Sequence, residues 1–173
     1  ADVATAEQAG EYDKAIEAVS KVSELTKAAE DGYANLRLGW LYYLKRDYQL
    51  AIQHYATSAI ALPRALSPRE GLMACYQALG NTERVIESAR GIVSIHAANY
   101  PANKTLADIY YGKGEYATAA LYYRHLATLN PTDLVMVTNL GWCYLQLGQL
   151  DEAEQVLNNV LTVSPLDNSA RQG

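Results

Sequence analysis

The sequence predicts an all-α fold built from stacked antiparallel helix pairs. Three observations favour it: a period of 34 residues, helical spacing of apolar residues within each period, and no stretch with the alternation of a strand. The period is carried by two columns of identical residues, Leu38, Leu72, Leu106 and Leu140, and Tyr42, Tyr76, Tyr110 and Tyr144. A period of this length is typical of helical repeats that bury a face against their neighbours.

Within the first full copy, two helices joined by a tight turn are expected. Leu38, Leu41 and Tyr42 have the i, i+3, i+4 spacing of one buried helix face. A turn follows at residues 45–47, and Ala51 and Tyr55 mark the inner face of a second helix. The later copies turn at residues 79–81, 112–114 and 147–149, where glycine can take the left-handed conformation that ends a helix.

Composition limits the classes of function. The 173 residues are 50% hydrophobic and only 19% charged, which excludes a disordered chain. The net charge of -5 offers no basic surface, so no nucleic-acid partner is expected. Charges interrupt every apolar run before it reaches the ~20 residues of a spanning helix, so no membrane span is expected either.

The columns resemble the tetratricopeptide repeat family in residue type and spacing. Copy one reads Leu38-Gly39, Tyr42, Ala51, Tyr55 and Pro63; copies three and four follow with Leu106-Ala107, Tyr110, Ala119, Tyr123 and Pro131, and with Leu140-Gly141, Tyr144, Ala153, Leu157 and Pro165. Copy two is the weakest match, and the family's first tryptophan is replaced by Asn35, Arg69, Asn103 and Val137. The resemblance implies a right-handed superhelix, an α-solenoid of stacked helix pairs.

The repeat register predicts the organisation of the chain. Four repeats are expected at residues 32–65, 66–99, 100–133 and 134–167. Residues 1–31 are expected to form a partial or divergent N-terminal repeat, because residues 10–16 repeat the turn and second-helix opening of a copy. Residues 168–173 are expected to be the truncated start of a following helix.

The resemblance also implies a concave groove that binds a peptide segment of another protein. The candidate groove residues are Tyr33, Leu36, Arg37, Trp40, Tyr43, Glu70, Gln77, Lys104, Asp108, Tyr111, Thr138, Asn139, Trp142 and Gln146. Large aromatic side chains such as Trp40 and Trp142 are enriched at binding hot spots. The alternative for both tryptophans is a packing role.

The family's chaperone-binding members grip a terminal carboxylate, and that set of residues is incomplete here. Lys104 is present, but Asp108 stands where an asparagine is needed and would repel a carboxylate. A chaperone C-terminal carboxylate is therefore not the expected partner, and an apolar or aromatic peptide is favoured.

No catalytic chemistry is predicted. Residues 112–117 fit a loose dinucleotide pattern but lack the preceding strand that it requires. His54, His96 and His125 lie in three different helices as partly exposed surface residues, and Cys75 and Cys143 are expected to be packed thiols. We expect no metal, no cofactor and no enzyme activity.

Two alternatives to peptide binding stay open. The last full helix is apolar on a broad stripe from Leu150 to Val163, which the six residues after 167 are not expected to cover. The chain could therefore assemble with copies of itself through that face, or serve as an accessory domain of a longer chain. Its start at Ala1 fits an exported bacterial protein whose leader is removed, and a cytoplasmic protein fits equally well.

Overall fold

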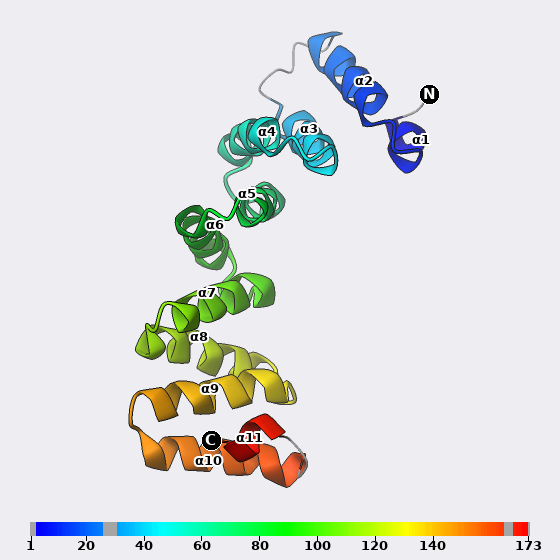
Figure 1. The fold of residues 1–173 in the computed structure, drawn as a ribbon. Helices are drawn as coiled ribbons and strands as arrows, with labels where there is room; N and C mark the ends of the chain where they lie inside the picture. Colours follow the sequence, from blue (N-terminus) through cyan, green and yellow to red (C-terminus); the bar gives the residue numbers. More distant parts are fainter. Residues whose placement is uncertain (1–2, 26–30, 165–167, 173) are drawn as a thin grey trace. The chain divides into compact units, whose positions relative to one another are not determined.

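The fold is all-α, as predicted. The computed structural model describes residues 3–25, 31–164 and 168–172, and these residues form eleven helices and no strand (Figure 1). The helices are α1 (Val3–Gln8), α2 (Tyr12–Leu25), α3 (Gly32–Leu44), α4 (Tyr48–Ala61), α5 (Ser67–Ala78), α6 (Thr82–Ile95), α7 (Tyr100–Gly112), α8 (Tyr116–Leu129), α9 (Leu134–Gln146), α10 (Leu150–Val163) and α11 (Asn168–Gln172).

The chain divides into two compact units, residues 1–95 with α1–α6 and residues 96–173 with α7–α11. In the first unit each helix packs against the next along α1 to α4, and α5 packs on α3, α4 and α6. In the second unit α8 packs between α7 and α9, and α10 packs on α9 and α11. Neighbours in sequence are thus neighbours in space, which is the packing expected of helical repeats.

Helix starts and turns follow the local sequence. Asp31, Asp47, Asn99 and Asp133 precede α3, α4, α7 and α9, and each side chain accepts a hydrogen bond from a backbone N–H of the first turn. The turns between paired helices place one residue in the left-handed region. Gly80, Gly114 and Gly148 take it, and Arg46 takes it with φ of 64°.

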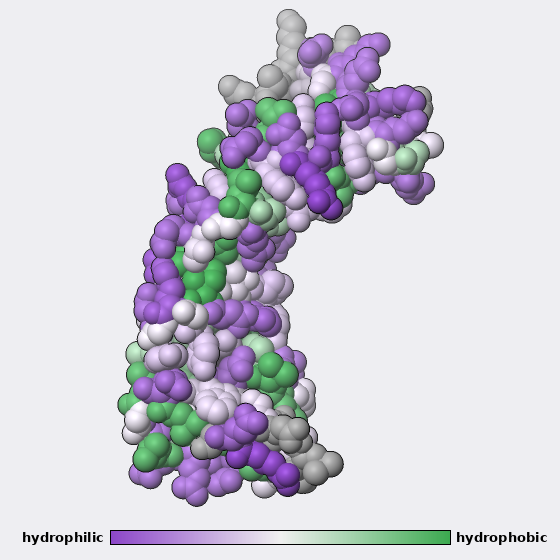
Figure 2. Space-filling view, in the orientation of Figure 1, coloured by the Kyte–Doolittle hydropathy of each residue, from purple (hydrophilic) through white to green (hydrophobic). Residues whose placement is uncertain are grey.

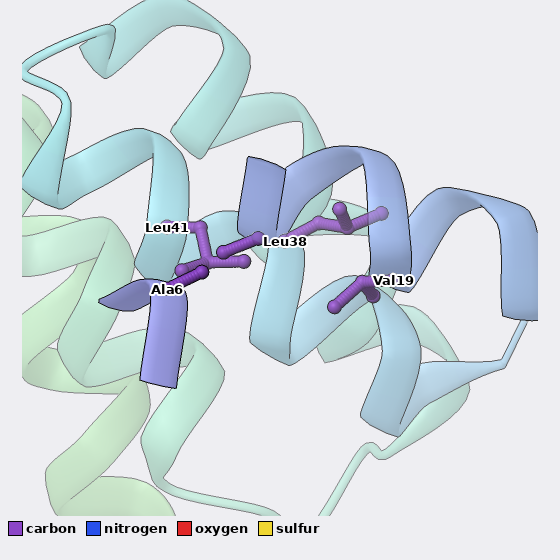
Figure 3. Close-up of a cluster of buried hydrophobic side chains, with 5 residues drawn as sticks. Ala6, Val19, Leu38 and Leu41 are labelled. Carbon is purple, nitrogen blue, oxygen red and sulfur yellow. The ribbon is translucent and has the colours of Figure 1, made fainter. Parts of the chain in front are cut away.

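The core of the first unit begins in the segment before residue 32. Ala6 of α1 and Val19 of α2 pack with Leu38 and Leu41 of α3 (Figure 3). The short helix α1 is therefore anchored on α3 by a buried side chain. The next residue of α1 is Glu7, which this contact brings close to α3.

One stacking arrangement recurs two repeats apart. Tyr42 stacks on His54 with ring centroids 5.2 Å apart, and Tyr110 stacks on Tyr122 at 5.9 Å. The first member of each pair belongs to the tyrosine column, and the partners are 68 residues apart. His54 is partly exposed, as expected, while its ring packs on a neighbouring helix. Its Nδ1–H donates to Asn35 Oδ1 over 2.9 Å.

Two asparagines occupy the position of the family's missing tryptophan. Asn35 and Asn103 are both buried. The amide of Asn35 donates to the carbonyl of Asp31, and that of Asn103 donates to the carbonyls of Ala97 and Asn99. These hydrogen bonds satisfy a buried polar group where the family usually places a large apolar one.

The helix α11 covers part of the last apolar stripe. Ala170 is buried against Leu157 and Val160 of α10, while Leu150 and Val163 stay exposed. The expectation that the terminal residues leave this face uncovered is therefore wrong for its central part. Over the face in view, hydrophobic residues form separate patches between hydrophilic ones (Figure 2). No helix in the described ranges is long and apolar enough to cross a membrane.

Candidate functional site

The first unit contains a pocket between α3 and α5, which we call the α3–α5 pocket. Its volume is about 540 Å³, within the range of ligand sites in proteins. It is lined by Tyr33, Leu36, Arg37, Trp40 and Tyr43 of α3, Tyr55 of α4, and Ser67, Glu70, Gly71 and Ala74 of α5. The helical spacing of the α3 residues puts their side chains on one face of that helix.

Trp40 and Arg37 are held on this wall by a carboxylate from another helix. The Trp40 Nε1–H donates to Glu7 Oε1 over 2.7 Å, and the guanidinium of Arg37 forms an ion pair with the other oxygen of Glu7. Glu7 lies on α1, which Ala6 anchors on α3. The indole is therefore fixed in orientation although its side chain is 41% exposed.

The aromatic side chains continue along the wall. Trp40 stacks on Tyr43 with ring centroids 6.0 Å apart, and the ring centroids of Tyr43 and Tyr48 of α4 are 5.6 Å apart. Tyr33, at the start of α3, is 71% exposed. The pocket therefore combines fixed aromatic rings with one ring that is open to solvent, which is an arrangement suited to contact an apolar group.

The floor of the pocket is the ring of Tyr55. A Cβ added at Gly39 would lie 2.7 Å from Tyr55 Cδ1, and one added at Gly71 would lie 2.4 Å from its Cζ. The ring is thus sandwiched between α3 and α5 at two positions that lack a side chain. Burial raises the pKa of the Tyr55 hydroxyl, so it stays protonated at physiological pH.

The α3–α5 pocket brings together six of the fourteen candidate residues. They are Tyr33, Leu36, Arg37, Trp40, Tyr43 and Glu70. Gln77, on α5, is exposed and does not line the pocket. The other seven candidates lie in the second unit.

Three of those seven take part in contacts within the second unit. Lys104 and Asp108 form an ion pair at 2.5 Å, and Asp108 Oδ1 accepts a hydrogen bond from Tyr123 over 2.7 Å. Tyr111 packs edge-on against Tyr116 and Tyr123. Burial, and then the bond to Asp108, raise the pKa of Tyr123. These groups satisfy one another rather than line an apolar pocket.

Trp142 and Thr138 lie near the C-terminal end. The Trp142 Nε1–H donates to Ser169 Oγ of α11 over 3.1 Å. Thr138 is only 3% exposed, and its Oγ1 has no hydrogen-bond partner among the described residues. Its placement differs from the expectation of a groove-facing residue, because its register position on α9 is buried. Asn139 is half-buried and Gln146 is exposed.

Among the residues that the structure describes, no other cluster suggests chemistry. Cys75 and Cys143 are free and fully buried, and burial raises the pKa of each thiol to about 11. Within the described ranges, no group of His, Cys, Asp or Glu side chains could hold a metal ion. The α3–α5 pocket is therefore the candidate site.

Five residues of this site lie outside the fourteen candidates. Tyr55, Ser67, Gly71 and Ala74 line the pocket, and Glu7 fixes its wall. One signal was present for Gly71, because a glycine inside a helix often marks a close approach of another group. The sequence held no comparable signal for Glu7, which lies in a short helix of a divergent repeat.

Comparison with known proteins agrees with this fold. Two family models described as tetratricopeptide repeat match residues 5–65 and 110–172. No curated protein matches the chain.

Several solved structures are similar. MamA shares 19% identity at a TM-score of 0.73, over 92% of this chain and 86% of that one. A tetratricopeptide repeat protein from Parabacteroides merdae shares 16% sequence identity at a TM-score of 0.76, and the match covers 98% of this chain and 67% of that one. YrrB is described as a tetratricopeptide repeat protein with an unusual peptide-binding site. It shares 15% sequence identity at a TM-score of 0.72, and the match covers 98% of this chain and 87% of that one.

Proposed function

The chain belongs to the tetratricopeptide repeat family, whose folds serve as protein–protein interaction scaffolds, and from that premise we propose that its α3–α5 pocket binds a peptide segment of a partner protein. The observation that carries this proposal is the pocket of about 540 Å³ whose lining includes four aromatic residues. The described residues form no metal-binding group and no cluster that supports a catalytic role, and we propose that the protein is not an enzyme.

The rigidity of the aromatic wall favours binding. Trp40 is fixed by Glu7 and by its stacking on Tyr43, so little rotamer freedom is lost when a guest docks. Preorganisation of this kind raises affinity because it lowers the entropic cost of association.

The charges around the pocket favour an apolar or aromatic guest over an acidic one. The guanidinium of Arg37 is already paired with Glu7, and Glu70 adds a second carboxylate on the α5 side. A guanidinium that is already paired, with a carboxylate on the facing helix, disfavours a terminal carboxylate as the ligand. YrrB, with its peptide-binding site on a similar fold, supports a peptide as the class of ligand.

The experiment is a selection of peptides from a displayed random library, followed by calorimetry. Selected peptides are titrated into the wild-type protein, Trp40→Ala and Gln77→Ala. Trp40→Ala removes a pocket wall and should weaken binding about tenfold or more, as hot-spot truncations do. Gln77 is exposed beside the pocket without lining it, so Gln77→Ala should bind as the wild type does.

Circular dichroism checks that both variants keep their helical content. Equal affinity of all three proteins would show that the peptides bind elsewhere, and the proposal would be wrong.

A further inference from the structure

Tyr55 carries a hydroxyl group whose hydrogen bond is not supplied by the protein. The residue as a whole is 3% exposed and lines the α3–α5 pocket. Among the described residues none forms a hydrogen bond with its hydroxyl, and the hydroxyl is not among the buried polar atoms that lack a partner. The hydroxyl is therefore open to the pocket, where it can donate a hydrogen bond to a guest.

The two flanking glycines fix where the hydroxyl lies. Cγ and Cδ1 of the Tyr55 ring lie against Gly39 of α3, and Cζ, which bears the hydroxyl, lies against Gly71 of α5. The ring therefore crosses the floor from α3 to α5. Since Gly71 itself lines the pocket, the hydroxyl is at the α5 side of the pocket floor.

The equivalent tyrosine in the second unit, Tyr123, has a hydrogen-bond acceptor that Tyr55 lacks. Tyr123 follows Tyr55 by two repeats, and its hydroxyl donates to Asp108 over 2.7 Å. The residue two repeats before Asp108 is Trp40, whose indole N–H can only donate. That N–H already donates to Glu7. In the first repeat a pocket and a tryptophan thus replace the carboxylate that accepts the hydrogen bond of Tyr123.

The charges on the pocket decide which acceptor fits. Arg37 is paired with Glu7, and Glu70 stands on the same α5 face as Gly71. An anionic ligand would meet the carboxylate of Glu70 in the pocket, and the guanidinium of Arg37 is already paired. An uncharged acceptor avoids that repulsion, and the main-chain carbonyl of a peptide is such an acceptor.

We propose that Tyr55 is a specificity-determining residue of the α3–α5 pocket, and that its hydroxyl donates a hydrogen bond to a main-chain carbonyl of the partner segment, next to an apolar side chain that fills the pocket. This inference rests on the proposed function. It adds the prediction that the pocket selects an internal, uncharged stretch of peptide over a free carboxylate.

A first measurement needs no ligand. Tyr55→Phe removes an unpaired hydroxyl, so the urea midpoint of unfolding should stay the same or rise. Tyr123→Phe removes a paired hydroxyl and leaves Asp108 without that donor, so its midpoint should fall. If Tyr55→Phe lowers the midpoint as much as Tyr123→Phe does, the Tyr55 hydroxyl has a partner within the protein and the proposal is overturned.

The second measurement is an NMR titration with N-acetyl-L-phenylalaninamide, which carries an aromatic ring and uncharged carbonyls. The indole signal of Trp40 reports on the pocket. We expect the dissociation constant to rise about three- to tenfold in Tyr55→Phe, which is the effect of one hydrogen bond, and to stay unchanged in Tyr123→Phe.

The charged relative N-acetyl-L-phenylalanine should bind the wild type more weakly than the amide. Tighter binding of the acid would overturn the proposal in favour of a carboxylate ligand. Equal binding of the amide to the wild type and Tyr55→Phe would overturn the role of the hydroxyl while leaving the pocket as a binding site. If neither probe moves the Trp40 signal up to its solubility limit, the proposed function itself fails.

Discussion

The Oε1 atom of Glu7 lies 2.7 Å from the Nε1 of Trp40, and its other carboxylate oxygen pairs with Arg37. One side chain of α1 thus holds two residues of the α3–α5 pocket. The helix α1 has only six residues, but Ala6 fixes it on the core of α3. The helix α1 therefore supports the candidate site as well as contributing to the core of the first unit.

Replacement of this carboxylate tests the contact. Glu7→Gln keeps the shape of the side chain and removes the charge that pairs with Arg37. Because Arg37 is partly exposed, we expect a loss of only about 0.5–1 kcal/mol in the free energy of unfolding. The chain has two tryptophans, so a ¹H–¹⁵N spectrum shows two indole signals. The signal of Trp40 should shift and that of Trp142 should not.

A matched control is Glu11→Gln, which breaks an exposed ion pair with Lys14 and should leave both indole signals unchanged. Assignment of the two signals follows from Trp142→Phe. Two indole signals that stay in place in Glu7→Gln would contradict the contact.

Gly71 is the second residue whose replacement has a clear consequence. In Gly71→Ala the new Cβ would meet Tyr55 Cζ at 2.4 Å, so the ring must move toward the pocket or the helices must separate. Overpacking of this kind costs about 1–3 kcal/mol, which exceeds the gain of about 1 kcal/mol from replacing a helical glycine. The urea midpoint should therefore fall.

Gly91→Ala is the matched control within α6. Its nearest neighbours are Arg69 Cδ and Nε at 3.6 and 3.7 Å, which is ordinary contact, so this variant should gain up to about 1 kcal/mol. A Gly71→Ala protein as stable as Gly91→Ala would show that the Tyr55 ring is not confined as described.

The stability of the protein should depend on the titration of His54. Burial lowers the pKa of His54 below its usual 6.5. Below pH 6.5 the unfolded chain therefore binds more protons than the folded one, and the free energy of unfolding falls as the pH falls through this range. Urea unfolding at a series of pH values between 8 and 5 measures the slope.

His54→Tyr is the control for this slope, because Tyr122 occupies the same register position and stacks on Tyr110 in the same way. The variant should keep the stacking and lose the part of the pH dependence that His54 contributes. His96 is exposed and His125 is partly exposed, and both remain in both proteins. If the free energy of unfolding depended on pH with the same slope in both proteins, the lowered pKa of His54 would be contradicted.

The fold could be predicted from the sequence because the same pattern of apolar residues recurs every 34 positions. Leu106 and Tyr110 are buried because the packing of one copy is imposed again in the next. A single helix pair would give an ambiguous pattern, whereas columns at a fixed period average out local exceptions. The two buried cysteines were predicted for the same reason, since both share one register.

The candidate site was readable only in part. The register placed six residues around the pocket, but it treats every copy alike and cannot tell Leu36, which lines a pocket, from Thr138 at the same position of the last copy, which is buried. The role of Glu7 depends on a contact across thirty residues, which no local pattern encodes. The partial exposure of His54 was predicted, but the stacking of its ring on Tyr42 of the preceding helix was not.

The burial of both native thiols makes the chain convenient for site-directed labelling. Cys75 and Cys143 are the only cysteines, and at neutral pH they are almost entirely protonated as well as shielded from reagents. A thiol introduced by Gln77→Cys, on an exposed position beside the α3–α5 pocket, would react selectively with a maleimide dye. Fluorescence from that single label could then follow the arrival of a guest without removal of the native cysteines.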